Sequence, residues 1–331
     1  MSENGYGESY DLQWEIGTTM VYATFAKPRG VGPFPVVVMA AGSGPTDRDW
    51  TSPLLPGSNG SARLLADALA QAGIASLRYD KRASGAHAME NMKALVGRLS
   101  MQSHVDEFTG AVDTLVARPD IDSGRIFGLG NSEGTLHVLN YHLSNPSAPL
   151  AGLVLTGVPG RAVGPVARSQ LAAQAALIPN GEALLALYDQ AIERFLRGEP
   201  AAPASELPDG VKDLFRSLEA PANQPFSREL WIADGASLLA NVDSPVLVII
   251  GKKDIQVDWR LDGELLQKAA QGKSGVTFFY PDDANHILKY EAKNREELTA
   301  SEVVPLYNED GRVLDSSTVD AIVTWLHDHG A

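Results

Sequence analysis

One serine of this chain lies in a sequence context that suits nucleophilic catalysis. Residues 130–134 read G-N-S-E-G, a G-x-S-x-G pattern centred on Ser132, between the predicted strand 125–129 and a segment with helical periodicity. A serine on a sharp strand-to-helix turn has a strained backbone, and glycines two residues before and after it remove side chains that would clash there. We therefore predict that Ser132 attacks a carbonyl carbon and forms an acyl-enzyme.

Two other roles for this segment compete with that prediction. Ser132 also suits a helix N-cap after a glycine-rich turn, which is a purely structural role. A dinucleotide-binding loop is the second alternative, because Gly128, Gly130 and Gly134 are closely spaced. Their spacing is one residue longer than the dinucleotide fingerprint, however, and they follow a middle strand rather than the opening one. The nucleophile interpretation is therefore preferred.

A serine nucleophile needs a general base, and after such a turn the partners follow in the chain order Ser, Asp or Glu, His. His286 satisfies this order, since it ends the loop 281–286 after the last predicted strand. The other histidines precede Ser132, lie in the helix that follows it, or end the last amphipathic helix: His87, His104, His137, His142, His327 and His329. We predict His286 as the general base, and its alternative role is that of a solvated loop histidine.

The acid that orients this base is expected just beyond a core strand. The run 246–250 continues into G-K-K-D, which places Asp254 in the following loop and ahead of His286 in the chain. Asp258, later in the same loop, is a credible substitute. Two further acids share the loop of the histidine and are expected to shape or solvate it: Asp282 and Asp283. We predict Asp254 as the third member of the triad.

An acyl-transfer site also needs backbone N–H groups that face the developing oxyanion. A buried strand is predicted to run into the loop A-G-S-G-P over residues 41–45, whose glycines let the backbone approach a ligand. We predict the N–H groups of Ser43 and Glu133 as the two donors. Gly44 can take the place of Ser43, and an ordinary tight turn is the structural alternative.

Two charged groups follow the strands nearest to this loop. They read D-R-D over residues 47–49 and Y-D-K-R over residues 79–82. We expect ion pairs and hydrogen bonds that hold the loop, because an arginine can bridge two carboxylates. The sequence has no H-E-x-x-H or comparable metal-binding spacing. We therefore expect neither a metal nor a cofactor.

Strands alternate with helices around these residues. Short apolar runs predict buried strands, and apolar residues at helical spacing predict the helices between them. The predicted strands are two antiparallel ones within 10–26 and then 34–40, 74–79, 125–129, 150–156, 246–250 and 276–280. The predicted helices cover 61–72, 104–117, 260–271 and 316–329. This alternation indicates an α/β fold with a mostly parallel, doubly wound sheet.

One connection between core strands, residues 158–243, is far too long for a loop and one helix. We predict that it is an inserted helical cap, and that residues 1–157 and 244–331 form the core. Its apolar residues exceed what a small core requires, so some are expected to line a substrate site: Leu184, Tyr188, Phe195, Leu214, Phe215, Trp231 and Ile232. We single out Trp231 and Phe215 as substrate contacts. The alternative is that all of these side chains only dock the cap.

The composition narrows the classes of partner. The chain has 27 basic and 41 acidic residues, and its net charge of −14 argues against binding to nucleic acid or to an anionic membrane. The absence of cysteine excludes a thiolate nucleophile and cysteine-based metal sites. Residues 1–15 lack the pattern of a secretion signal, and no run approaches the ~18 apolar residues of a membrane span. We expect a cytoplasmic protein, and a homodimer stays open.

Several strings of this chain carry a family resemblance: A-G-S-G-P-T-D-R-D at 41–49, L-R-Y-D-K-R at 77–82, G-L-G-N-S-E-G at 128–134, G-K-K-D-I-Q-V at 251–257 and D-A-N-H at 283–286. Together they resemble the bacterial α/β-hydrolase family of capped serine esterases and related peptidase-like hydrolases, over nearly the whole chain outside the insertion. The resemblance implies an α/β-hydrolase fold with an eight-stranded sheet, a helical cap and the triad Ser132, Asp254 and His286. Ala41, where many relatives have histidine, and K-R-A-S-G at 81–85, in place of the commoner K-R-G-x-G, depart from the family pattern.

These features predict a serine hydrolase, and first of all a carboxylesterase. Its substrate is expected to be a small or medium-sized uncharged ester that is cleaved through an acyl-enzyme. Peptidases or amidases, thioesterases and lactonases share the same triad and are the enzymatic alternatives. A ligand-binding protein that keeps the triad without turnover is the alternative from another class, because fold does not determine function.

Overall fold

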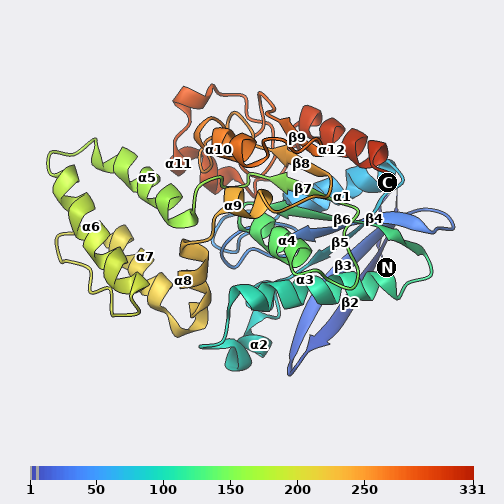
Figure 1. The fold of residues 1–331 in the computed structure, drawn as a ribbon, viewed down its shortest axis with the longest axis horizontal. Coiled ribbons are helices and arrows are strands. Elements are labelled where there is room, and N and C mark those ends of the chain that lie inside the picture. The colour runs from blue at the N-terminus through green and yellow to red at the C-terminus, as the bar shows by residue number, and fades with distance from the viewer. Residues whose placement is uncertain (1, 5–6) are drawn as a thin grey trace.

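A nine-stranded sheet runs through the centre of the computed structural model, which describes residues 2–4 and 7–331 (Figure 1). The strands are β1 (Ser2–Asn4), β2 (Gly7–Ile16), β3 (Thr19–Pro28), β4 (Phe34–Ala40), β5 (Ala75–Tyr79), β6 (Ile121–Asn131), β7 (Gly152–Thr156), β8 (Val246–Ile249) and β9 (Val276–Phe279). Their order in the sheet is β1-β2-β3-β5-β4-β6-β7-β8-β9. The first three strands and the β3–β5 pair are antiparallel, whereas all pairs from β5 through β4 to β9 are parallel.

The predicted fold, a mostly parallel sheet with helices on both faces, is confirmed. The eight expected strands are β2 to β9, and β4 has the bounds 34–40 that the apolar run predicts. The three-residue strand β1 pairs with β2 and adds a ninth strand at the antiparallel edge. Its sequence, S-E-N, has no apolar residue, so hydrophobic patterning gives no signal for it.

Strand β4 shows how the sheet is buried on both faces. Val36 and Val38 belong to one hydrophobic cluster and Val37 and Met39 to another, because successive side chains of a strand point to opposite faces. Helices cover both faces of the sheet and contribute to these clusters. The first face is covered by α3 (Met101–Val116), α4 (Glu133–Leu143), α9 (Gly235–Leu239) and α10 (Leu261–Ala269), and the second by α1 (Ser61–Gln71) and α12 (Ser316–Asp328).

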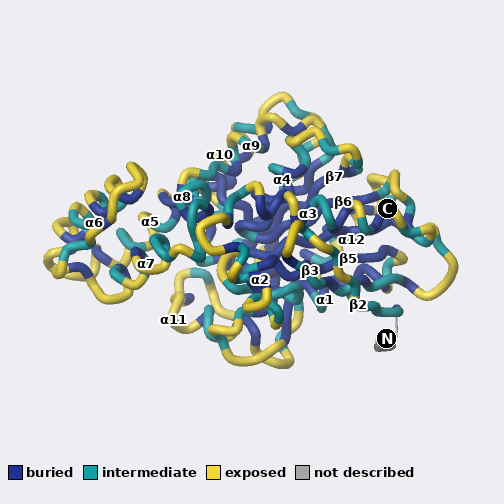
Figure 2. The backbone as a smooth tube through the Cα atoms, turned by 90° about the horizontal axis from the view of Figure 1, so that it is seen from below, coloured by how far each residue is buried: buried dark blue, intermediate teal, exposed yellow. Residues whose placement is uncertain are grey.

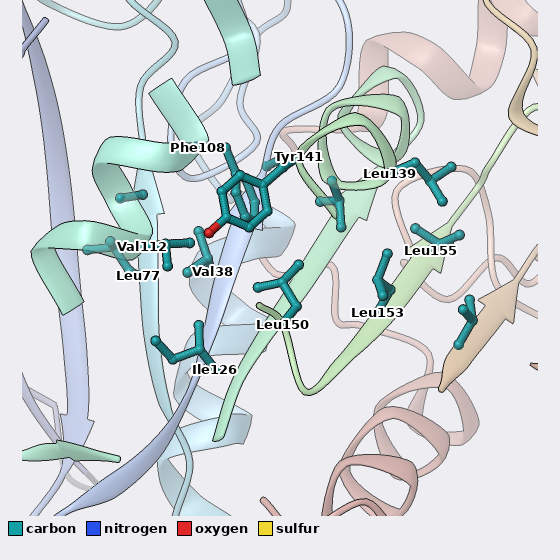
Figure 3. Close-up of a cluster of buried hydrophobic side chains, with 14 of the residues drawn as sticks. Val38, Leu77, Phe108, Val112, Ile126, Leu139, Tyr141, Leu150, Leu153 and Leu155 are labelled. Atoms are coloured by element: carbon teal, nitrogen blue, oxygen red, sulfur yellow. The ribbon is translucent and has the colours of Figure 1, made fainter. Parts of the chain in front are cut away.

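The core on the first face holds the strand end and the helix that flank Ser132. In Figure 3, Phe108 and Val112 of α3 and Tyr141 of α4 lie over Val38 and Ile126 of the sheet. These side chains are completely or almost completely buried. Because full burial of such a side chain contributes ~1.5–3 kcal/mol, this core fixes β6 and α4 relative to each other.

The inserted segment contributes a separate group of helices. They are α5 (Val163–Ala175), α6 (Gly181–Leu196), α7 (Asp209–Glu219), the 3-10 helix η1 (Pro221–Asn223) and α8 (Phe226–Trp231). In Figure 1, α5, α6 and α7 lie apart from the sheet, and α8 lies between them and the core. Figure 2 shows that the outer surface of this group is largely exposed. The last helix within 158–243, α9, instead packs against α4 and α10.

Some short elements carry no pattern long enough to be predicted. They are α2 (Ala88–Leu95), after β5, and η2 (Arg295–Glu297), α11 (Ala300–Val303) and η3 (Val304–Leu306), between β9 and α12. The latter three surround a small apolar cluster that includes Ile287, Leu298, Val303 and Tyr307. Among the described residues, none of the helices combines the length and the apolar character that crossing a bilayer requires.

Candidate active site

Ser132 stands at the junction of β6 and α4. Its φ of 53° and ψ of −123° lie outside the regions that side-chain-bearing residues normally adopt, and its N–H donates to the carbonyl oxygen of Thr156 at 2.9 Å. A Cβ atom at Gly134 would lie 2.3 Å from the carbonyl oxygen of Ala40, and one at Gly130 would lie 2.5 Å from the backbone of Gly134. Close backbone approach therefore requires both glycines of the G-x-S-x-G sequence.

His286 and Asp254 form a buried pair. The Nδ1 atom of His286 lies 2.8 Å from Oδ2 of Asp254, and both residues are at most 5% exposed. The other carboxylate oxygen accepts the backbone N–H groups of Gln256 and Val257 at 2.7 and 3.0 Å. Because an ionised carboxylate only accepts hydrogen bonds, the proton of a neutral His286 resides on Nδ1, and Nε2 keeps a lone pair for a substrate proton.

Two glycines let the loops that carry this pair approach each other. A Cβ atom at Gly251, after β8, would lie 2.1 Å from the carbonyl oxygen of Ala284 in the loop after β9. Gly157, after β7, has a φ of 56°, and a Cβ atom there would lie 3.3 Å from Nδ1 of His286. The loops that follow three parallel strands thus meet at one edge of the sheet, where ligands bind in open α/β folds.

The other acids considered from the sequence have different partners. Asp258 lies at the start of α10, where its Oδ1 accepts the backbone N–H groups of Arg260 and Leu261 at 2.8 and 3.0 Å. The two acids near the histidine pair with lysines of the loop after β8: Asp282 with Lys252, and Asp283 with Lys253. Of these four acids, Asp254 is the one bonded to His286.

Asn131 is a residue of this site that the sequence analysis missed. Its side-chain Nδ2 atom donates to the carbonyl oxygen of His286 at 3.0 Å and to Oγ1 of Thr156 at 3.1 Å. It therefore ties the residue before Ser132 to the loop of the histidine. Asn131 occupies the first variable position of G-x-S-x-G, where the motif requires no particular side chain. Its partner His286 lies 155 residues further along the chain, so local spacing contains no signal for this contact.

Ser132 and His286 both line two adjoining cavities. One, of about 300 Å³, lies between the loop 41–45 and the segment 304–308, and the described residues that line it include no Asp, Glu, Lys or Arg. The other, of about 140 Å³, is covered by Val163, Val166, Ala167 and Gln170 of α5. Concave, mostly apolar linings with a few convergent polar groups are typical of small-molecule sites.

The loop 41–45 passes directly beside the serine. A Cβ atom at Gly42 would lie 3.3 Å from Cβ of Ser132, and Ser43, Ser132 and Glu133 line the 140 Å³ cavity together. The ammonium group of Lys81 donates to the carbonyl oxygen of Gly42 at 2.6 Å and to Oε1 of Glu133 at 2.9 Å. One buried lysine thus connects the two segments from which the oxyanion donors are predicted.

Behind Glu133 lies a buried polar cluster that the sequence analysis did not predict. Nε2 of His137 lies 3.1 Å from Oε1 of Glu133, and its ring centroid lies 4.4 Å from that of His104. His104 contacts Glu107 at 2.8 Å, and Glu107 accepts a hydrogen bond from Arg82 at 2.9 Å. The spacing of His104 and Glu107 on α3, and of Glu133 and His137 on α4, predicts that each pair shares a helix face. It does not show that α3 and α4 bring the two pairs together.

The charges of this cluster balance one another. Burial raises the pKa of the Glu133 carboxyl, but Lys81 and His137 together hold it well below its ordinary value. Burial is the main cause that lowers the pKa of His137 to about 4, so its ring is neutral near pH 7. Ligand atoms of His104, Glu133 and His137 lie within 4.8 Å of one another, as a metal site would require. The Lys81 ammonium already neutralises that carboxylate and would repel a divalent ion.

The charged residues 47–49 pair with side chains within β5 and directly after it. Arg48 contacts Asp80 through its backbone N–H at 2.7 Å and through two guanidinium nitrogens at 3.1 and 2.7 Å. Asp49 pairs with Arg78 at 2.9 Å. The expected ion pairs are present, but their main partners lie on the neighbouring strand rather than within the D-R-D string. They hold the segment after β4 against the end of β5.

The cap residues chosen from the sequence have different environments. Trp231, at the end of α8, lines a third cavity, of about 310 Å³, which also borders Ser43 and Glu133. Phe215 lies in the buried apolar core that the helices of residues 158–243 form, with its ring centroid 5.8 Å from that of Tyr188, and it lines none of these three cavities. The prediction of Phe215 as a substrate contact is corrected accordingly, because its ring fills the interior of the cap.

Most of the other apolar residues chosen from 158–243 also pack inside the core of this segment. Members of its buried cluster are Leu184, Tyr188, Phe195, Phe215 and Trp231, with Leu214 packed against it, whereas Ile232 is 66% exposed. The expected surplus of apolar side chains is therefore largely used by the cap core. The sequence analysis underestimated how many apolar side chains the helices of this segment bury among themselves.

A sharp turn with a strained serine and a histidine–carboxylate pair, all at the same edge of a parallel sheet, defines the α/β-hydrolase class of folds. Comparison with known proteins agrees: residues 37–298 match the alpha/beta hydrolase family. This chain belongs to that family.

The similarity to individual proteins is low, at 30% sequence identity or less for the following three. The chain is 30% identical over 302 residues to the esterase EstD of Thermotoga maritima, which covers 90% of this chain and 63% of that protein. It therefore spans less than two thirds of the length of this curated relative. An esterase structure from Pyrococcus furiosus has a TM-score of 0.55 at 16% identity, covering 97% of this chain and 91% of that one. Dienelactone hydrolase from Anabaena variabilis has a TM-score of 0.53 at 15% identity, covering 98% of each chain. At these identities the structural matches establish the fold alone.

Proposed function

We propose that this protein is a serine carboxylesterase that cleaves small or medium-sized uncharged esters through an acyl-enzyme. The observation that carries the proposal is the 2.8 Å contact between His286 and Asp254, with His286 and the strained Ser132 lining the same cavities. The likeness to the esterase EstD supports an ester as substrate. A cytoplasmic location and a homodimer stay predictions.

In the first half of the proposed reaction, Oγ of Ser132 bonds to the carbonyl carbon while Nε2 of His286 takes the hydroxyl proton. Asp254 holds the ring and stabilises the imidazolium that forms. The carbonyl oxygen becomes an oxyanion and accepts the N–H groups of Ser43 and Glu133. When the tetrahedral intermediate collapses, the bond to the leaving oxygen breaks, and that oxygen takes the proton from His286.

In the second half, a water molecule attacks the acyl carbon of the ester on Ser132. His286 accepts a proton from the water and returns it to Oγ as the acyl bond breaks. The carboxylic acid leaves, and the free serine is restored. Every proton is carried by His286 and the oxygen nucleophile is water, so the cycle needs no cofactor.

Two features support an uncharged substrate and a role for the cap. No described residue that lines the 300 Å³ cavity beside Ser132 and His286 is Asp, Glu, Lys or Arg. A charged group there would therefore lose its hydration without an ionic partner. Helix α5 covers the 140 Å³ cavity, and Trp231 of α8 lines the 310 Å³ cavity. We propose that residues 158–243 act as a cap, with α5 and α8 as the helices that restrict the substrate.

A fluorophosphonate probe tests the proposal directly. The probe is expected to label one site, Ser132, and Ser132→Ala should abolish both labelling and ester hydrolysis, with a loss of ~10⁶ in kcat. Ser144→Ala, at the far end of α4, is the matched control and should keep full activity. Ester hydrolysis near the wild-type rate in Ser132→Ala would overturn the mechanism.

A substrate panel separates the other functions of the same triad. Chromogenic carboxylic esters, thioesters, lactones and amino-acid anilides should be compared by kcat/KM with the purified protein. The proposal expects the carboxylic esters to be the best substrates. Preference for anilides would indicate a peptidase or amidase, and labelling without turnover of any panel member would favour a ligand-binding protein.

A further inference from the structure

The mechanism described so far makes no use of Lys81, although its ammonium group lies next to the predicted oxyanion hole. This side chain is 6% exposed and donates hydrogen bonds to the carbonyl oxygen of Gly42 at 2.6 Å and to Oε1 of Glu133 at 2.9 Å. Its backbone is also held, because the N–H and the hydroxyl of Ser84 donate to the Lys81 carbonyl oxygen at 2.7 and 3.0 Å. The lysine is therefore a fixed point between the loop after β4 and the first turn of α4.

The carbonyl group of Gly42 and the N–H group of Ser43 belong to the same peptide unit. Cis peptide bonds in the described residues occur elsewhere, before Pro33 and Pro225, so this unit is trans and its C=O and N–H groups point in opposite directions. A donor that holds the carbonyl therefore also sets the direction of the N–H. A positive charge at the carbonyl oxygen also polarises the peptide unit and makes its N–H a stronger donor.

We propose that Lys81 is a positioning residue that orients and polarises the Gly42–Ser43 peptide unit for stabilisation of the oxyanion. The inference rests on the proposed function. It also decides between the two candidate donors in this loop, because the peptide unit that Lys81 holds supplies the N–H of Ser43 and not that of Gly44. The same ammonium group binds the side chain of Glu133, whose backbone N–H is the second donor, so one cation links both donor segments.

The alternative is that Lys81 only neutralises the buried carboxylate of Glu133. Removing the lysine alone does not separate the two roles, because an unpaired buried carboxylate destabilises the fold by itself. The double variant Lys81→Met with Glu133→Gln does separate them. Glutamine removes the buried charge and keeps the backbone N–H of residue 133, whereas methionine retains the apolar stem of the lysine without a donor for Gly42.

A neighbouring ion pair gives a matched control. Arg82 and Glu107 form an equally buried pair at 2.9 Å in the same cluster, and no hydrogen bond among the described residues joins either side chain to the loop 41–45. The double variant Arg82→Met with Glu107→Gln therefore removes one buried ion pair without releasing the Gly42 carbonyl. Thermal unfolding of both double variants establishes how much of any effect is a loss of stability.

The measurements are kcat and KM for the best ester of the panel, the rate of fluorophosphonate labelling, and the affinity for a trifluoromethyl ketone, which forms an oxyanion on reaction with the serine. In Lys81→Met/Glu133→Gln we expect kcat to fall by about 100-fold, with KM changed by less than about threefold, because the interaction exists mainly in the transition state. Labelling rate and ketone affinity should fall in parallel. The Arg82→Met/Glu107→Gln control should lose less than about threefold in kcat.

Wild-type kcat and ketone affinity in a folded Lys81→Met/Glu133→Gln variant would overturn the inference and leave the proposed esterase function intact. An equal loss of activity in the control pair would also overturn it, because the effect would then belong to the buried cluster as a whole. A wild-type protein that neither reacts with the fluorophosphonate nor cleaves any ester would instead refute the proposed function, and the inference with it.

Discussion

The imidazole of His286 and the carboxylate of Asp254 are joined at 2.8 Å although 32 residues separate them in the chain. The pair forms because the loops after β8 and β9 leave neighbouring parallel strands at the same edge of the sheet. Two backbone N–H groups hold the other carboxylate oxygen, so the carboxylate has partners of its own besides the histidine. The pair is thus preorganised for a role in proton transfer.

Asp254→Asn should lower kcat by about 10⁴-fold without unfolding the protein, because an amide in this position favours the wrong histidine tautomer. Asp258→Asn, which changes an acid at the start of α10, should alter kcat by less than about threefold. Steady-state ester hydrolysis and thermal unfolding of both variants check this prediction. A large loss of kcat in Asp258→Asn with a mild effect of Asp254→Asn would transfer the role to Asp258.

Gly134→Ala should both destabilise the fold and impair activity, because the new Cβ would lie 2.3 Å from the carbonyl oxygen of Ala40. Overpacking of this kind costs ~1–3 kcal/mol or more, and relief of the clash would move the turn that carries Ser132. Gly210→Ala is the control, since a Cβ at that helical position meets no atom within 4 Å. It should leave activity unchanged and stabilise the protein by up to ~1 kcal/mol. Urea unfolding and kcat/KM provide the comparison, and equal behaviour of the two variants would contradict the steric argument.

Trp231→Ala should change the preference for acyl chain length, because Trp231 lines the 310 Å³ cavity beside Ser43 and Glu133. Each methylene accommodated in an apolar pocket is worth ~1–3 kcal/mol in kcat/KM, so the ratio for long against short acyl esters should rise by about tenfold or more. Phe215→Ala, inside the cap core, should lower stability by ~3–5 kcal/mol with little change in that ratio. The ratio of kcat/KM for long against short acyl chains is measured with a series of p-nitrophenyl esters. An unchanged ratio in a folded Trp231→Ala variant would assign Trp231 to scaffolding.

Acid should destabilise the protein through His137, whose pKa is lowered by burial to about 4 in the folded state. The unfolded chain binds a proton at this side chain near pH 6.5, but the folded chain does not, so the free energy of unfolding falls as the pH drops from about 6.5 towards 4. The slope from this group is at most ~1.4 kcal/mol per pH unit. Urea unfolding at pH 7.5, 6.0 and 5.0 should show a shallower dependence in His137→Gln than in wild type. An unchanged slope in His137→Gln would exclude this origin.

The sequence alone was enough to predict most of the fold. The continuous apolar run of β4 arises because this strand is buried on both faces. The helical spacing of apolar residues in α12 arises because one face of the helix is buried. The strand β1 and the short helices after β9 escaped prediction because they contain too few residues for any period to appear. The long connection 158–243 was visible in the sequence, yet its internal core was not, since the contact of Phe215 with Tyr188 joins two helices.

For the site, the sequence by itself singled out Ser132 and favoured His286. The strained turn needs its two glycines within five residues, and the other histidines precede the serine or lie in predicted helices. Tertiary structure alone decided that His286 bonds to Asp254 rather than Asp258, that Asn131 holds the histidine loop, and that Lys81 joins the carbonyl of Gly42 to Glu133. The physical reason is range. A steric requirement between neighbours in the chain leaves a fixed spacing of residue types. A hydrogen bond between segments 32 to 155 residues apart depends instead on where the sheet and its helices place them, and no local spacing records that.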